Sequence, residues 1–212
     1  MLLRDTQRLA ALRDIRRYFD RNHGPFAAYN ASGSRTSLDT LTEELGTLAH
    51  EHEEHRIGAR AERAREVRLA DELRRKHFRV IVDAQALLED SLPGLGRIRF
   101  PRRRTNSTVL ATRARALARA LRRHTKVFLE FGLKPDFLAR LRADAAALKA
   151  AVLAKGAHRG ARLRTTHAIA DAVSRARHQV RVADAFVRAA VEPGSPLLAE
   201  WQALCRAFRR PA

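Results

Sequence analysis

The segment of alternating histidine and glutamate at residues 50–55 is the first candidate for metal chemistry. Its sequence is His-Glu-His-Glu-Glu-His, and both side-chain types bind transition metals when several of them converge. The spacing matches neither the H-E-x-x-H of zinc proteases nor the Glu-x-x-His of di-iron bundles, because Thr47, Ala49 and His52 stand three residues before the three histidines. The sequence offers no second Glu and His cluster to close such a site. We therefore predict a solvated helix face, with His52 and His55 at the edge of an apolar seam, and neither a metal nor a cofactor.

A serine, an aspartate and two histidines share one helical stripe in the C-terminal part, at His167, Asp171, Ser174 and His178. These are the residue types of a hydrolase triad. At 100° per residue, however, the stripe lies about 200° from the apolar seam of its helix. Side chains there face water, where no oxyanion hole forms. We predict that the chain is not an enzyme.

Three other reactive side chains are predicted to be structural. His77 and His124 fall on apolar seams, which is typical of core or interface histidines. Cys205, the only cysteine, lies on a short amphipathic segment and is predicted to be a small buried hydrophobe. A single cysteine cannot form an intrachain disulfide and gives no sign of an oxidising compartment.

The charge is large and unevenly distributed. The chain has 42 Lys and Arg against 23 Asp and Glu, a formal charge of +19. Residues 1–95 hold 16 basic and 16 acidic side chains, whereas residues 96–212 hold 26 basic and 7 acidic ones. Such a segregated charge concentrates polyanions near one part of a molecule. Part of the arginine can instead reflect the base composition of the gene, because only five of the 42 basic residues are lysine, and Arg and Ala share GC-rich codons.

The basic residues of the C-terminal part form three groups that we predict to contact nucleic acid or another polyanion. Arginine suits bidentate contact with phosphate. The zinc-finger, RNP and KH patterns are not found and aromatic residues make up only 6%, so the contacts are expected to read the backbone and not the bases. The groups are a loop with Arg97, Arg99, Arg102, Arg103 and Arg104; a helix stripe with Arg115, Arg119, Arg122 and Lys126; and a cluster with Arg159, Arg162 and Arg164.

The elements that must position these groups are predicted to be helices throughout. Apolar residues recur at helical period in almost every long segment, which indicates an all-α fold, an elongated antiparallel bundle of about six helices. A kink is expected at Gly58 in the longest helix, and a break or a kink is expected at Gly156 and Gly160, between the fourth helix and the fifth. The helices are expected at 4–22, about 36–90 with a cap at Thr36 or Ser37, 107–131 with a cap at Asn106 or Ser107, from Pro135 towards Gly156, at about 161–191, and from Pro196 to about 208.

A tight antiparallel hairpin is predicted around residues 131–135. Gly132 suits the left-handed position after a helix, and Leu133 is placed to pack back on Phe128 as in a Schellman motif. Pro135 then opens the next helix, where its missing amide costs nothing.

The organisation and the surroundings follow from the same observations. We predict one helical domain over 1–212, with a charge-neutral part at 1–95 and a strongly basic part at 96–212. Charges follow directly on the first apolar residues and the chain lacks a run of 18 apolar residues, so we expect no signal peptide, no membrane partner and a cytoplasmic location.

The long helix exceeds what a compact bundle covers, which predicts a homo-oligomer. The alternative function is therefore a structural, self-associating bundle without a nucleic-acid role.

Overall fold

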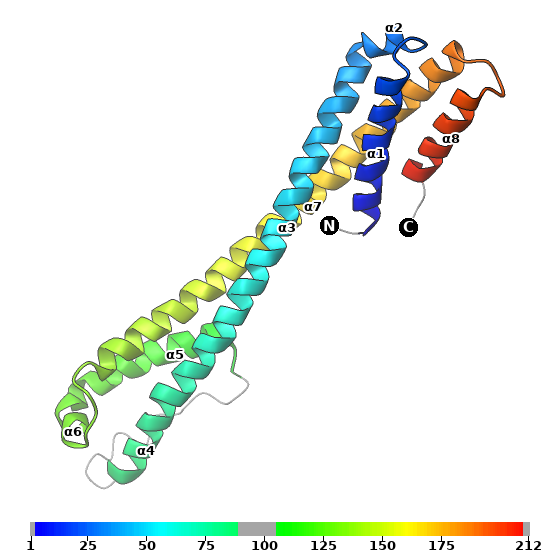
Figure 1. Cartoon of the computed structure of the whole chain (residues 1–212). Coiled ribbons are helices and arrows are strands. Elements are labelled where there is room, and N and C mark those ends of the chain that lie inside the picture. The colour runs from blue at the N-terminus through cyan, green and yellow to red at the C-terminus, as the bar shows by residue number, and fades with distance from the viewer. Residues whose placement is uncertain (1–2, 89–104, 210–212) are drawn as a thin grey trace. The chain divides into compact units, whose positions relative to one another are not determined.

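The computed structural model describes residues 3–88 and 105–209, and every regular element in these ranges is a helix. The all-α prediction is thus confirmed for the described part of the chain (Figure 1). None of its helices is long and apolar enough to cross a membrane. The elements are α1 (Leu3–Arg21), α2 (Ala27–Asn30), α3 (Gly33–Glu72), the π-helical η1 (Leu73–Phe78), α4 (Arg79–Leu88), α5 (Ser107–Ala120), the 3₁₀-helical η3 (Leu121–His124), α6 (Thr125–Glu130), α7 (Phe137–Ala190) and α8 (Pro196–Arg209).

The chain forms two compact units, whose boundaries fall inside α3 and α7. Unit 1 comprises Met1–Arg56 and Gly160–Ala212, and unit 2 comprises Ile57–Arg159. Each unit has a hydrophobic core of its own. The single domain stays a prediction, but the grouping shows that the last 53 residues belong with the N-terminal segment and not with the rest of the basic half.

Unit 1 is built around aromatic side chains on α1 and α8. These two helices lie side by side and run in opposite directions (Figure 1). Trp201, Tyr18 and Phe19 are fully buried, and the ring centres of Tyr18 and Trp201 lie 5.5 Å apart. Phe26 and Tyr29 of the segment between α1 and α3 are also buried in this core. Burying several such rings supplies much of the stability of a small unit.

The N-terminus of α3 lies earlier than predicted. Ser32 caps the helix by accepting a hydrogen bond from the Arg35 amide at 3.3 Å. Thr36 and Ser37, the predicted caps, lie inside the helix. The Ser37 hydroxyl donates to the Gly33 carbonyl at 2.8 Å, so it is satisfied by the preceding turn and caps nothing.

The long helical stretch is not broken at Gly58, and its change of helix type lies at η1. Helical structure continues through Gly58 to the end of α3. A Cβ at Gly58 would lie 2.5 Å from Cε1 of His158, so the glycine is needed for the close approach of α3 to α7. The change in register comes instead as a π-helical segment at Leu73–Phe78, which propensity does not foretell.

The segment 107–130 is helical as predicted but not straight. The Asn106 side chain accepts from the Thr108 amide at 2.8 Å and caps α5. The 3₁₀ turn η3 then separates α5 from α6, and His124 has φ −109° and ψ 13°, outside helical values. A regular 100° step therefore does not carry the register of α5 into α6.

The predicted hairpin is confirmed. Gly132 has φ +92°, and the Leu133 amide donates to the Phe128 carbonyl at 2.9 Å, which is the Schellman bond. Pro135 stands just before the next helix and does not open it, because α7 begins at Phe137.

The break predicted at Gly156 and Gly160 is wrong, because α7 is one helix of 54 residues. Each glycine costs about 1 kcal/mol relative to alanine in a helix, which packing on both sides outweighs. The seam of Ile169, Val173 and Val180 is buried as predicted. Ser195 caps α8 by accepting from the Leu198 amide at 3.3 Å.

The apolar seam of the long helical stretch is covered within the chain. Leu38, Leu41 and Leu45 are buried in the core of unit 1, and Leu73 and Ile81 in the core of unit 2. The homo-oligomer stays a prediction, but the seam that motivated it is already buried.

Candidate nucleic-acid interface

The formal charge gathers in unit 2. Residues 57–159 hold 25 Lys and Arg against 10 Asp and Glu, a formal charge of +15, whereas the segments of unit 1 hold 17 against 13, a charge of +4. The sequence from Ser91 to Leu129 contains 11 basic residues and no carboxylate. Unit 2 is therefore where a polyanion would be attracted.

The predicted helix stripe lies in this unit and faces water. Arg115 and Arg119 on α5, Arg122 on η3 and Lys126 on α6 are all exposed. None of the four forms a salt bridge with a described residue. We call these four residues the basic face. Because η3 changes the direction of the chain, Lys126 follows on a different helix axis and the stripe is not the straight line that a single helix would give.

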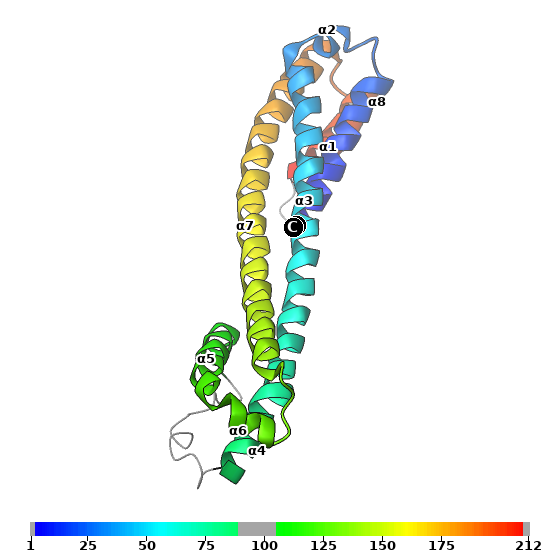
Figure 2. The ribbon, with the colours of Figure 1, turned by 90° about the vertical axis from the view of Figure 1, so that its left-hand side faces the viewer.

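The residues on the opposite side of α5 are buried, and this orients the basic face towards solvent. Leu110, Ala114, Leu117 and Leu121 are buried in the core of unit 2, as the seam predicted. Arginines one residue away from these positions point about 100° away from the core. Figure 2 shows α5 beside the first part of α7, which belongs to the same unit. The packing thus presents the cations without burying their charge.

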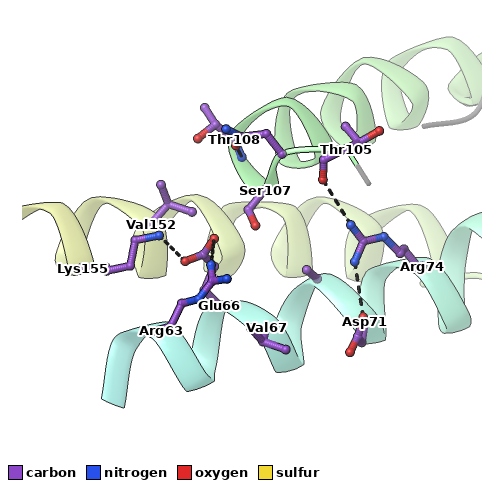
Figure 3. A pocket seen from close by; sticks show the side chains of 12 residues that line it. Arg63, Glu66, Val67, Asp71, Arg74, Thr105, Ser107, Thr108, Val152 and Lys155 are labelled. Carbon is purple, nitrogen blue, oxygen red and sulfur yellow. Dashed lines mark hydrogen bonds and ion pairs between the residues drawn. The ribbon is translucent and has the colours of Figure 1, made fainter. Parts of the chain in front are cut away.

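Polar contacts hold the N-terminus of α5 against α3 and η1 (Figure 3). Arg74 donates to the backbone oxygen of Thr105 at 3.2 Å and to Asp71 at 3.3 Å. Glu66, whose side chain is 5% exposed, pairs with Lys155 of α7 and with Arg63. Burial alone would raise the pKa of Glu66, but hydrogen bonds from Lys155 and from the Ser107 hydroxyl outweigh it and lower that pKa. An ionised Glu66 therefore links three helical segments, and this fixes the start of the basic face.

The predicted cluster at residues 159–164 is divided between the two units. Arg159 belongs to unit 2, but Arg162 and Arg164 belong to unit 1. All three are exposed. Arg97, Arg99, Arg102, Arg103 and Arg104 lie outside the described residues.

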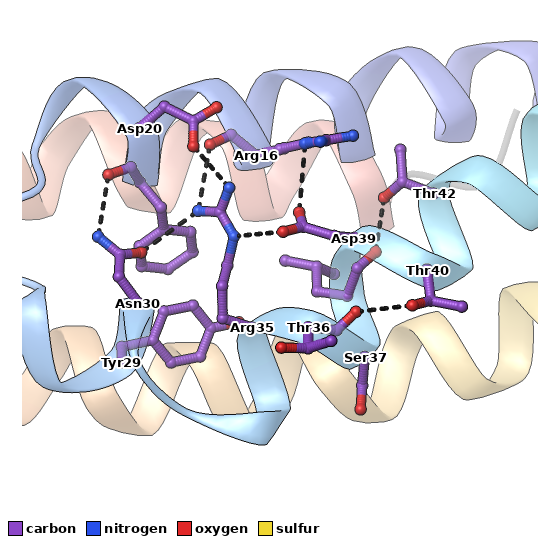
Figure 4. Close-up of polar contacts among 12 residues, drawn as sticks. Arg16, Asp20, Tyr29, Asn30, Arg35, Thr36, Ser37, Asp39, Thr40 and Thr42 are labelled. Atoms are coloured by element: carbon purple, nitrogen blue, oxygen red, sulfur yellow. Dashed lines mark hydrogen bonds and ion pairs between the residues drawn. The ribbon is translucent and has the colours of Figure 1, made fainter.

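Arg35 of unit 1 is in a different state (Figure 4). Its side chain is 9% exposed and donates to Asp20 at 2.6 Å and to Asp39 at 2.9 Å. It also donates to the backbone oxygen of Arg16 and to the Asn30 side chain. The hydrogen bonds to Asp39 and Asp20 raise the pKa of Arg35 although burial opposes them. This guanidinium holds α1, the α2 segment and α3 together and is not available to a ligand.

The histidine and serine candidates lie as the sequence analysis expected. His50 is exposed and lies 3.3 Å from Glu54, while His52 is buried beside the seam. All four residues of the stripe His167, Asp171, Ser174 and His178 are exposed. Among the described residues, no group of three or more His, Cys, Asp or Glu side chains is arranged to hold a metal. Cys205 is buried, and burial raises the pKa of its thiol to about 11.

Two features were missed by sequence reasoning. The first is the pairing state of the arginines, for which a signal exists: Arg175 and Arg188 have an aspartate four residues earlier and pair with it, while the stretch 91–129 has none. The second is a contact of 2.7 Å between His77 and Asp144, residues 67 positions apart, which no local pattern indicates.

The chain matches no protein-family model, no curated protein and no solved structure.

Proposed function

We propose that the chain binds nucleic acid through its phosphates, using unit 2 and in particular the basic face on α5, η3 and α6. The observation that supports this most is that Arg115, Arg119, Arg122 and Lys126 are exposed, free of salt bridges to described residues and part of a stretch without carboxylates. Cations that are not neutralised from within attract an external polyanion. In this proposal the chain acts by binding alone.

The proposed contacts are to the backbone and not to the bases. A guanidinium donates two parallel hydrogen bonds to one phosphate, and each phosphate so neutralised releases condensed counterions. The three arginines span about two helical turns and then a change of direction at η3, which suits a curved row of phosphates. We expect affinity to depend strongly on salt and weakly on sequence.

A titration of the full chain with a mixed-sequence DNA duplex, and with an RNA duplex, tests the proposal. The logarithm of the affinity should fall with the logarithm of the salt concentration at about −0.9 per neutralised phosphate, with roughly four to eight contacts for DNA. The triple variant Arg115→Gln, Arg119→Gln, Arg122→Gln should weaken binding at about 50 mM salt by tenfold or more and flatten the slope by up to about three.

A matched control removes the same charge from unit 1. Arg177, Arg181 and Arg206 are exposed and form no salt bridge with a described residue, so the triple Gln variant at these positions should bind nearly as the wild type does. Equal losses in the two triple variants would assign the effect to net charge and would count against a defined face. Replacing Arg102, Arg103 and Arg104 by alanine tests whether the loop that leads into α5 extends the face.

The alternative, a self-associating bundle without a nucleic-acid role, remains the second outcome of the same experiment. No binding to either duplex at about 50 mM salt, together with a dimer or larger assembly in light scattering, would favour it. A monomer that binds with the expected salt dependence would exclude it.

A further inference from the structure

A cavity of about 650 Å³ lies in unit 2 beside the hairpin between α6 and α7. Four short segments line it: η1, the start of α4, the hairpin turn and the first turns of α7. Its volume falls in the range of small-molecule sites, about 300–1,000 Å³. None of its lining residues belongs to the basic face, so the cavity calls for an explanation of its own.

Part of the cavity wall is apolar. Val80, Phe131, Leu133 and Phe137 line it. The Phe131 side chain, next to the Gly132 turn, is 37% exposed. Two aromatic rings and two aliphatic side chains form a surface that suits the apolar body of a small molecule.

One of the positively charged side chains that line the cavity is not paired with a described carboxylate. Asp144 is engaged by Nε2 of His77 at 2.7 Å, and Asp136 by Arg140 at 2.5 Å. Lys134 is exposed and forms no salt bridge with a described residue. With both carboxylates occupied, the group still able to pair with a ligand is an ammonium, which selects an anion. The +15 formal charge of unit 2 acts in the same direction.

His77 is an independent sign that the cavity is more than a packing defect. Its side chain is 5% exposed, it lines the cavity, and its Nδ1 has no hydrogen-bond partner among the described residues. A buried polar atom without a partner costs about 1–3 kcal/mol. The residue also lies in the π-helical segment η1, and π-helical turns are frequent at functional sites.

We propose that this cavity binds a small amphipathic organic anion, an acid with an aromatic or aliphatic body and one carboxylate or sulfonate group. Lys134 pairs with the acidic group, while Phe131, Phe137 and Val80 cover the apolar body. The inference does not depend on the nucleic-acid proposal, since the two sites share no residue.

A fluorescence titration of the full chain with 8-anilinonaphthalene-1-sulfonate, an aromatic anion of this class, provides the test. We expect saturable binding of one probe molecule, displaced by decanoate at a concentration at least about threefold lower than that of neutral decanol. Val80→Phe fills the cavity and should weaken binding about tenfold or more, whereas Leu153→Phe adds the same kind of side chain at an exposed position of α7 and should change it less than twofold.

A second pair of variants keeps the test valid if Val80→Phe does not fold. Lys134→Gln should weaken probe binding about three- to fivefold, the range that one exposed ion pair supports. Lys149→Gln removes the same charge from an exposed position of α7 outside the cavity and should have no effect. Equal binding by a folded Val80→Phe variant and the wild type, or equal effects of the two lysine variants, would overturn the proposal.

Discussion

Two sets of arginines, one in each unit, are used in opposite ways. In unit 1, Arg35 pairs with Asp20 and Asp39, and Arg175 pairs with Glu44 and Asp171. In unit 2, the arginines of the basic face have no such partner among the described residues. The number of arginines is therefore a poor guide to a binding surface, and the carboxylates around them are a better one.

The difference has an energetic side. A buried guanidinium has lost its water and depends on its carboxylates, so removing either partner leaves an uncompensated charge. An exposed guanidinium keeps its water and contributes little to folding. We therefore expect substitution of the buried Arg35 in unit 1 to lower stability, and substitution of the exposed arginines of the basic face in unit 2 to lower ligand affinity.

The largest expected effect is that of Arg35→Met. The substitution removes the partner of Asp20 and Asp39. We expect it to lower the free energy of unfolding by about 3 kcal/mol, the lower end of the range for breaking a buried ion pair, because the Asp20 side chain is 58% exposed and stays solvated. DNA affinity should be unchanged under conditions where the variant is folded. Arg119→Met on the basic face should change stability by less than about 0.5 kcal/mol and should weaken DNA binding. Urea denaturation and the duplex titration measure the two quantities. Similar stability losses in both variants would abolish the contrast between the units.

Asp184 gives the next largest effect, through pH. It accepts from Nε1 of Trp201 at 2.8 Å and from Arg188 at 3.1 Å. Burial alone would raise the pKa of Asp184, but these bonds outweigh it and lower that pKa. The stabilisation is therefore complete above the unfolded pKa of about 4 and is lost as the pH falls through the lower folded pKa. Asp184→Asn should cost about 1–3 kcal/mol at pH 7 and flatten the acid limb of a stability profile measured by urea denaturation; an unchanged acid limb would show that other carboxylates control it.

Two glycines of unit 2 test the effect of helix packing on stability, since replacing either by alanine leaves the charge unchanged. A Cβ added at Gly156 would meet no atom of another residue within 4 Å, so Gly156→Ala should stabilise the protein by about 1 kcal/mol. At Gly58 a Cβ would meet the His158 ring, and we expect the alanine variant to lose that gain. The gain should return when His158→Ala is added, which thermal unfolding of the three variants measures. Equal stabilisation by Gly58→Ala and Gly156→Ala would show that the His158 ring simply moves aside.

The smallest effect concerns His52. Burial lowers its pKa below the ordinary value of about 6.5. The unfolded chain then takes up the proton first, so stability should decline as the pH falls from about 6.5 towards the folded pKa. We expect this decline to be the smallest of the effects considered, because it comes from a single imidazole. His52→Gln should remove it, and an identical profile for the variant would assign the decline to another group.

The parts of the fold that local chemistry determines could be predicted from the sequence. The Asn106 cap, the Gly132 turn and the buried seam around Val173 each depend on residues within a few positions of one another. The errors arose where distant packing overrides local preference: Gly156 remains helical, and η1 carries the irregularity expected at Gly58.

The candidate site was predictable to a similar degree. The positions and the exposure of the basic face follow from the helical period. The unit to which each arginine belongs does not, because Arg162 joins the N-terminal segment through contacts more than 100 residues apart. His77 and Asp144 meet for the same kind of reason, so the cavity beside them was invisible in the sequence.

The order of the two units along the chain bears on how the protein assembles during synthesis. Unit 2 is one continuous stretch, whereas the core of unit 1 joins Leu12 and Phe19 to Trp201 and Phe208. Unit 1 therefore cannot close until the last helix has left the ribosome, while unit 2 is complete some fifty residues earlier. Helices that form early in unit 2 also shorten the effective loop that unit 1 must close, which lowers its entropic cost. Until then the aromatic side chains of α1 remain exposed, and the nascent chain is most prone to aggregate during that interval.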